Sequence, residues 1–130
     1  MPGRVMVVDD SEADRLFAQI MLERWAPGAS VVGFESARAA LVHLHAPGHG
    51  VNLVLLDINM PGMDGWGFLA ACEAAPALAE GPRVVMLTSS PDPADQQRAQ
   101  AHDRVLGFIT KPLSRDALQA LNGWLALAAD

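Results

Sequence analysis

Hydrophobic positions along the chain form short apolar runs that alternate with longer amphipathic stretches. The apolar runs are RVMVV (4–8), SVVGF (30–34), LVLLD (53–57), RVVMLT (83–88) and RVLGFIT (104–110). Most are rich in β-branched residues, and all have the length of a buried strand. The run at 53–57 is the most continuously apolar of the five. We therefore expect five strands, with 53–57 at the centre of the sheet.

The stretches between these runs carry apolar residues at helical spacing and begin at residues that favour helix N-termini. Ser11, Ser36, Asp92 and Ser114 precede four of them, and Pro93 follows Asp92 at the first helical position. The side chains expected to face inward from the first helix are Leu16, Phe17, Ile20, Met21 and Trp25. Those expected from later helices are Ala40, Leu41, Leu44, Phe68, Leu69, Cys72, Leu118, Leu121, Leu125 and Leu127.

Strands that alternate with helices predict an α/β fold. A parallel sheet needs helical crossovers, and these cover both of its faces, so we expect a doubly wound five-stranded sheet. The sequence shows no linker, low-complexity tract or internal repeat, and it stops where the fifth expected helix ends. We therefore expect a single domain over residues 1–130 with no output domain.

Composition narrows the class of protein. The 130 residues carry a net charge of −6, which argues against nucleic acid as a partner, because a nucleic-acid binder usually presents a basic surface. A single cysteine, Cys72, excludes an internal disulfide and suits a reducing compartment. No apolar run is long enough to span a membrane, so we expect a cytoplasmic protein without a membrane partner.

Polar side chains gather at the carboxyl ends of the expected strands. The first strand leads into Asp9 and Asp10, the third ends in Asp57, the fourth in Thr88, and a short loop after the fifth carries Lys111, the only lysine in the chain. In open parallel sheets ligands bind at this edge. Three carboxylates there favour a hard cation such as Mg²⁺, and the lysine and hydroxyl suit phosphoryl oxygens. Asp57, on the most buried strand, is the natural nucleophile for an aspartyl phosphate.

Four motifs then match a known family in order and position. DD at 9–10, LLDINMPGMDG at 55–65, MLTSS at 86–90 and FITKPL at 108–113 resemble the receiver domain of bacterial response regulators. The resemblance covers essentially the whole chain and implies a flavodoxin-like strand order of 2-1-3-4-5. It implies a single-domain, chemotaxis-regulator-like response regulator of a two-component or phosphorelay system. Such a protein is not an enzyme on other substrates, but it promotes its own phosphorylation and dephosphorylation.

The resemblance also implies roles for the strand-end residues. Asp57 would accept a phosphoryl group from a sensor histidine kinase or a histidine phosphotransfer protein. Asp9, Asp10, Asp57 and the backbone carbonyl of Asn59 would hold Mg²⁺, for which Mn²⁺ is expected to substitute. Lys111 would contact the phosphoryl oxygens.

Further positions would control the response to phosphorylation. Thr88 and Phe108 would form the conformational switch, and Asn59 and Ser90 would tune the lifetime of the acyl phosphate. The bond between Lys111 and Pro112 is often cis in the family. The signal would leave by altered docking to a downstream protein that the sequence does not name, from a monomer or a phosphorylation-dependent dimer.

Other classes remain as alternatives. An aspartyl-phosphate phosphatase of haloacid-dehalogenase type uses similar groups, but it needs a second acid where Asn59 stands. A flavin carrier would place carboxylates Asp9 and Asp10 against the flavin phosphate. An unphosphorylated receiver-like interaction module would not need every site residue. His43, His45 and His49 lack acidic or cysteine partners nearby in the sequence, so we expect them to be solvated and to bind no metal.

Overall fold

The computed structural model describes residues 3–89 and 92–128, with side chains described as far as residue 125. The strands are β1 (Arg4–Val8), β2 (Ser30–Phe34), β3 (Leu53–Asp57), β4 (Arg83–Thr88) and β5 (Val105–Thr110). The helices are α1 (Glu12–Trp25), α2 (Ala37–His45), α3 (Gly65–Ala74), α4 (Pro93–Gln100) and α5 (Arg115–Ala128), with a 3₁₀ turn η1 (Pro76–Leu78) after α3. Each expected strand is present, and β5 begins one residue later than expected.

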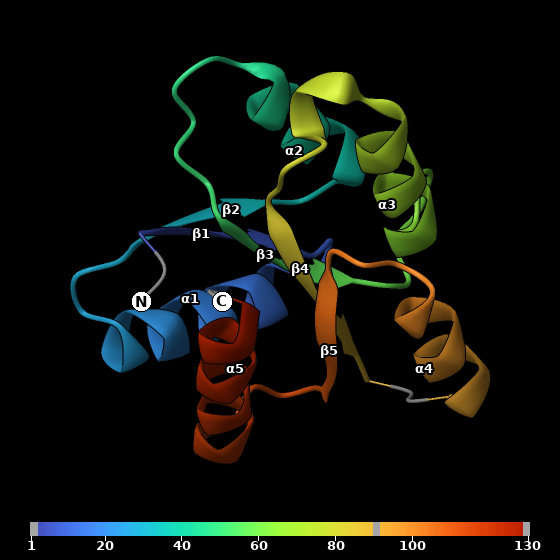
Figure 1. The fold of residues 1–130 in the computed structure, drawn as a ribbon. Helices are drawn as coiled ribbons and strands as arrows, with labels where there is room; N and C mark the ends of the chain where they lie inside the picture. The colour runs from blue at the N-terminus through green and yellow to red at the C-terminus, as the bar shows by residue number, and fades with distance from the viewer. Residues whose placement is uncertain (1–2, 90–91, 129–130) are drawn as a thin grey trace.

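The strands form one parallel sheet in the order β2-β1-β3-β4-β5 (Figure 1). Helices α1 and α5 cover one face, and α2, α3 and α4 cover the other, so two apolar cores lie against the sheet. Every residue of β3 is buried, as its continuous apolar sequence predicts. The doubly wound fold class and its strand order are confirmed.

The four expected helix caps are confirmed by hydrogen bonds to backbone N–H groups. Ser11 Oγ accepts from Asp14 N at 3.3 Å, Ser36 Oγ from Ala39 N at 3.1 Å, Asp92 Oδ1 from Ala94 N at 2.9 Å and Ser114 Oγ from Ala117 N at 3.1 Å. Helix α3, which begins after Asp64, has a cap that was not among the four expected. The carboxylate of Asp64 accepts from Gly67 N at 2.9 Å. Local side-chain chemistry thus sets the start of every α-helix.

The expected inner face of α1 is partly wrong. Leu16, Phe17 and Ile20 are 50%, 44% and 50% exposed, whereas Ala18 and Leu22 are buried against the sheet. The spacing of bulky residues pointed to one stripe of the helix. The helix instead contacts the sheet through the neighbouring stripe, on which the small Ala18 permits close approach. Of the expected residues, Met21 and Trp25 do pack against this core.

The other helices bury the expected side chains. Ala40, Leu44, Phe68, Leu69, Cys72, Leu118 and Leu121 are buried, and Leu41 and Leu125 pack against the two cores. The side chain of Leu127 lies outside the described residues. None of the described helices combines the length and apolar character needed to cross a bilayer.

The expectation of solvated histidines holds for His45 but is wrong for the other two. His43 and His49 are half-buried, with ring centroids 6.3 Å apart, and the ring of His43 lies 5.1 Å from that of Phe34. Burial lowers the pKa of His49, and its Nδ1 accepts a hydrogen bond from Val51 N at 2.9 Å. The ring of His43 therefore packs against Phe34 of β2, with the ring of His49 nearby.

Packing explains why a glycine stands at position 107 in β5. A Cβ atom at this position would lie 2.5 Å from the Trp124 ring of α5, well inside van der Waals contact. Glycine lowers intrinsic strand propensity, but here it lets the indole of α5 lie directly against the β5 backbone. Gly107, which interrupts the apolar run 104–110, is thus the position at which α5 contacts the strand.

Candidate functional site

Polar residues from the ends of three strands meet at one edge of the sheet. Asp9 and Asp10 follow β1, Asp57 ends β3 and Thr88 ends β4. Carboxylate oxygens of the three aspartates lie within 4.8 Å of one another. Asp9 and Asp57 are only 1% and 5% exposed, whereas Asp10 is exposed. The structure therefore brings together the acidic residues that the sequence analysis selected.

Lys111 joins this acidic group from the loop after β5. Its Nζ atom lies 2.6 Å from Asp9 Oδ2, 3.0 Å from Asp14 Oδ2 and 3.6 Å from Asp57 Oδ1. Its backbone N donates to the carbonyl of Thr88 at 2.7 Å, which attaches the loop to the end of β4. The bond between Lys111 and Pro112 is cis. One ammonium group therefore serves three carboxylates from different segments.

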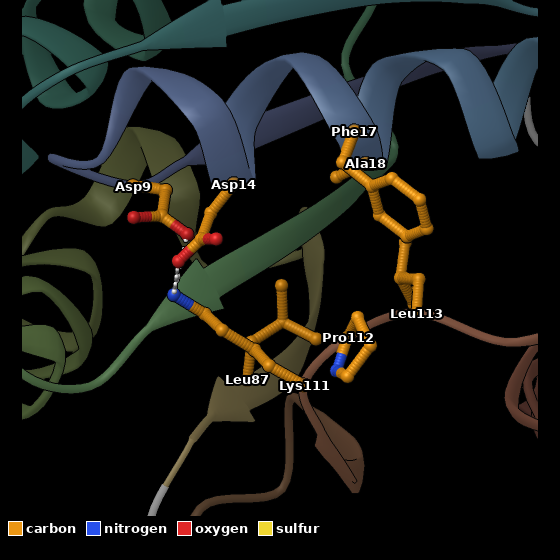
Figure 2. A pocket seen from close by; sticks show the side chains of 8 residues that line it. All are labelled: Asp9, Asp14, Phe17, Ala18, Leu87, Lys111, Pro112 and Leu113. Atoms are coloured by element: carbon orange, nitrogen blue, oxygen red, sulfur yellow. Dashed lines mark hydrogen bonds and ion pairs between the residues drawn. The ribbon is translucent and has the colours of Figure 1, made fainter.

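Asp14 and Arg15 of α1 are site residues that the sequence analysis did not identify. Figure 2 shows Asp14 and Asp9 pointing toward the end of the Lys111 side chain from the α1 side. Arg15 donates from its guanidinium to the Asp9 carbonyl at 2.9 Å. Asp14 stands in the first helical turn, where an acidic residue is explained by the helix dipole alone. Nothing local in the sequence signals its contact with Lys111.

Backbone hydrogen bonds fix Asp9 in place. Its N–H donates to the Phe34 carbonyl of β2 at 3.0 Å, and its Oδ1 accepts from Ser11 N at 2.9 Å. With Lys111 on Oδ2 and Arg15 on the carbonyl, this buried residue is held from several directions. The acidic site is thus preorganised on its β1 side.

Burial and the neighbouring carboxylates change the protonation behaviour of Asp57. Burial raises its pKa from 3.8 to about 6; Lys111 opposes this rise, and the charges of Asp9 and Asp10 add to it. Burial also acts to lower the pKa of Lys111, but hydrogen bonds to Asp9 and Asp14 outweigh it and the pKa is raised. At neutral pH the site therefore holds an ammonium beside a carboxylate that is more basic than usual.

The loop after Asp57 returns tightly to the site. Gly62 adopts a φ of +77°, which favours glycine, and Gly65 N donates to the Ile58 carbonyl at 2.9 Å. A Cβ atom at Gly65 would lie 2.9 Å from the carbonyl oxygen of Asp57. Asn59 is exposed at the start of this loop. The two glycines thus let α3 begin directly against the end of β3.

Two of the residues expected to control the response, Thr88 and Phe108, lie on neighbouring strands. Thr88 is buried, and Phe108 of β5 is partly buried and lines a groove between β5 and α4. Ser90, expected to tune the lifetime of the phosphate, lies outside the described residues. The switch roles of Thr88 and Phe108 and the tuning roles of Asn59 and Ser90 stay predictions.

The donor set suits a hard divalent cation. The group formed by Asp9, Asp10 and Asp57 offers oxygen donors alone, and no histidine or cysteine belongs to it. Carboxylate oxygens with room for water match the preference of Mg²⁺ better than that of a softer metal. The residues present therefore fit the expected cofactor.

A flavodoxin-like sheet with an acidic group and a lysine at its carboxyl edge defines the class of an open α/β domain whose candidate ligand site lies at that edge. Residues 5–122 match the family model of the response regulator receiver domain. The chain therefore belongs to the response regulator receiver family.

Similar proteins agree with this assignment. The chain is 32% identical over 127 residues to the sensor histidine kinase GacS of Pseudomonas protegens, covering 96% of this chain and 13% of that protein. It is 35% identical over 127 residues to the two-component response regulator ORR1 of Oryza sativa subsp. japonica, covering 91% and 53%. The chain thus spans only part of the curated relatives that it matches, and these include a plant protein.

Solved structures share the fold over nearly their whole length. A two-component response regulator from Cytophaga hutchinsonii superposes with a TM-score of 0.84 at 29% identity, with 95% of this chain and 97% of that chain covered. The chemotaxis protein CheY4 of Vibrio cholerae gives a TM-score of 0.77 at 25% identity, with 95% and 98% covered. The receiver fold and the family expected from the four motifs are confirmed.

Proposed function

We propose that this protein is the phosphoacceptor of a two-component or phosphorelay system, and that Asp57 takes a phosphoryl group from a histidine of a partner protein. The observation that carries the proposal is the position of Asp57, a buried carboxylate of raised pKa between two other aspartates and Lys111. A carboxyl with a pKa of about 6 is mostly ionised at neutral pH, and it is a stronger nucleophile than an ordinary carboxylate.

The chain's own residues account for the transfer. An Asp57 oxygen would form a bond to phosphorus while the bond from phosphorus to the histidine nitrogen breaks. The electron pair of the broken bond stays on that nitrogen, and the histidine leaves as neutral imidazole when its other ring nitrogen carries a proton. The ammonium of Lys111, 3.6 Å from Asp57 Oδ1, would neutralise the phosphoryl oxygens, and the Thr88 hydroxyl would donate to another. The protein would in this way promote its own phosphorylation and dephosphorylation without acting on another substrate.

Asp9, Asp10, Asp57 and the backbone carbonyl of Asn59 would hold Mg²⁺, with Mn²⁺ as a substitute. The cation would supply positive charge to the transferring phosphoryl group. Because Asp10 is exposed, we expect its replacement to leave the fold intact. Its loss would remove one oxygen donor from the cation site.

The expected donor is a sensor histidine kinase or a histidine phosphotransfer protein in the cytoplasm. The exposed α1 side chains Leu16, Phe17 and Ile20 support such a partner, because they belong to the same helix as Asp14 at the site. Scattered apolar residues are normal on surfaces, but three on adjoining turns form a patch suited to a helical partner. The response would be a change at Thr88 and Phe108 that alters docking to a downstream protein, from a monomer or a phosphorylation-dependent dimer.

Intact mass spectrometry tests the proposal directly. Incubation with acetyl phosphate and Mg²⁺ should add one base-labile phosphate to the wild-type protein. Asp57→Asn should gain none, and in Asp10→Ala the Mg²⁺-dependent phosphorylation should be abolished. An adduct that persists in Asp57→Asn would place the phosphate elsewhere and contradict the assignment of Asp57.

A second candidate function is a receiver-like interaction module that acts without phosphorylation. In a pull-down, such a module would recover the same partners with and without the phosphodonor. Wild-type protein and Asp57→Ala would also recover them equally. Partners recovered only by the phosphorylated protein would favour the phosphoacceptor. The complete set of charged site residues favours the phosphoacceptor.

A further inference from the structure

The Lys111 ammonium lies nearer to two other carboxylates than to Asp57. The distances from Nζ are 2.6 Å to Asp9, 3.0 Å to Asp14 and 3.6 Å to Asp57. Asp9 is buried and fixed by backbone hydrogen bonds, so its contact with the lysine is part of the framework of the site. Asp14 is different, because it reaches the lysine from the first turn of α1 at the mouth of a small pocket (Figure 2).

Among the described residues, the carboxylate of Asp14 makes no hydrogen bond within the helix that carries it. Its backbone N–H receives the cap from Ser11, a contact that does not involve the carboxylate. The carboxylate is 49% exposed, and Lys111 is its one ion-pair and hydrogen-bond partner among the described residues. The contact joins positions 97 residues apart in the sequence, from α1 to the loop after β5.

Two interactions compete for the ammonium group of Lys111. In the proposed transfer the ammonium must neutralise oxygens of a phosphoryl group on Asp57. Asp14 attracts the same ammonium toward the first turn of α1 (Figure 2). Because an ion pair with one exposed partner is weak, it can bias the lysine without trapping it.

We propose that Asp14 is a positioning residue that holds Lys111 on the α1 side of the site before phosphorylation and thereby slows phosphoryl transfer to Asp57. The inference rests on the proposed function of Asp57. The apolar remainder of the pocket, formed by Phe17, Ala18, Leu87, Pro112 and Leu113, confines the lysine stem between α1 and the loop after β5. The ammonium can therefore move between Asp14 and Asp57 by small changes at the end of the side chain.

The test compares Asp14→Asn with the matched control Glu12→Gln. Both variants remove one negative charge from the first turn of α1, but Glu12 makes no ion pair with any residue that the structure describes. Asp14→Asn should be phosphorylated by acetyl phosphate about two- to fivefold faster than the wild-type protein, as expected for loss of an exposed ion pair. Glu12→Gln should change the rate less, and Asp14→Glu should restore the slower wild-type rate.

The single lysine of the chain provides a readout that does not depend on phosphorylation. Protein labelled with ¹³Cε- and ¹⁵Nζ-lysine gives one set of side-chain NMR signals, all from Lys111. These signals should shift in Asp14→Asn and remain in place in Glu12→Gln. A purely structural effect of the substitution would not produce this difference or be reversed by Asp14→Glu.

The outcomes separate this inference from the proposed function. Equal rates and equal lysine signals in Asp14→Asn and Glu12→Gln, with phosphate on every variant, would overturn the role of Asp14 alone. Slower phosphorylation of Asp14→Asn would also overturn it, because Asp14 would then assist Lys111. Absence of phosphate on the wild-type protein would overturn the proposed function and, with it, the kinetic role of Asp14.

Discussion

At the scale of single residues, the site concentrates like charges that the fold must tolerate. Asp57 is buried beside Asp9 and near Asp10, and one lysine cannot neutralise all of them. The raised pKa of Asp57 records the cost of holding its charge there. The charged form of Asp57 therefore destabilises the folded protein, and this loss should be measurable in the free energy of unfolding.

The pH dependence of Asp57→Asn measures this loss. With a pKa of 3.8 unfolded and about 6 folded, Asp57 binds a proton more tightly in the folded protein. Stability therefore falls as the pH rises through this window and levels off above it. We expect Asp57→Asn to gain about 1–3 kcal/mol relative to the wild-type protein between pH 4 and pH 7.

Urea unfolding at pH 4 and pH 7 in EDTA would provide the measurement. Asp116→Asn, which removes an exposed carboxylate from α5, controls for the change in net charge. The same pH response in both variants would show that the position of Asp57 imposes no special cost. Only the difference between the two pH values is compared, so constant effects of the asparagine cancel.

At the scale of elements, the packing of β5 against α5 depends on one missing side chain. The indole of Trp124 occupies the space where a Cβ atom of residue 107 would lie. Lys111 follows directly on β5, so the seating of this strand also positions the ammonium. A glycine in the middle of a strand is therefore part of the support of the site.

Gly107→Ala should destabilise the protein by about 1–3 kcal/mol, because the new methyl group overlaps the indole ring. In a Trp124→Leu background the same substitution should cost much less, since the clashing ring is gone. Urea denaturation of the four proteins in this double-mutant cycle would give the coupling energy. If Gly107→Ala lowers the free energy of unfolding equally in both backgrounds, the loss comes from the backbone conformation at residue 107 and not from a clash with the Trp124 ring.

At the scale of the whole molecule, the two faces of the sheet present different surfaces. The face covered by α1 and α5 carries the half-exposed side chains Leu16, Phe17 and Ile20, whereas on the α2 face Val42 is the one exposed large hydrophobic residue among those that the structure describes. Only the first group shares its helix with Asp14 at the site. A protein that delivers a phosphoryl group to Asp57 would approach over this helix.

The double variant Leu16→Ser/Ile20→Ser should accept phosphate from acetyl phosphate at the wild-type rate. Transfer from its preferred donor in a panel of autophosphorylated histidine kinases should slow by roughly tenfold, as expected when contacts at the centre of an interface are lost. Val42→Ser, on the other face of the sheet, should behave as wild type in both assays. Unimpaired transfer to the α1 variant would exclude this surface from donor binding.

Much of the fold and of the site follows from local features of the sequence. The five strands, the four expected caps and the carboxylates Asp9 and Asp57 were predictable, because apolar periodicity and capping chemistry act within a few residues. Strand ends of a parallel sheet share one edge, so the meeting of these carboxylates with Lys111 also followed. The sequence by itself thus determined the elements and the core of the site.

The tertiary structure alone decided which surfaces meet. It turned Ala18 and Leu22 of α1 toward the sheet in place of Leu16 and Ile20, and it set Trp124 against Gly107. It also gave Lys111 a third carboxylate partner, Asp14. Each of these contacts depends on how a helix is positioned on the sheet by many distant side chains, and no spacing within one segment contains that information.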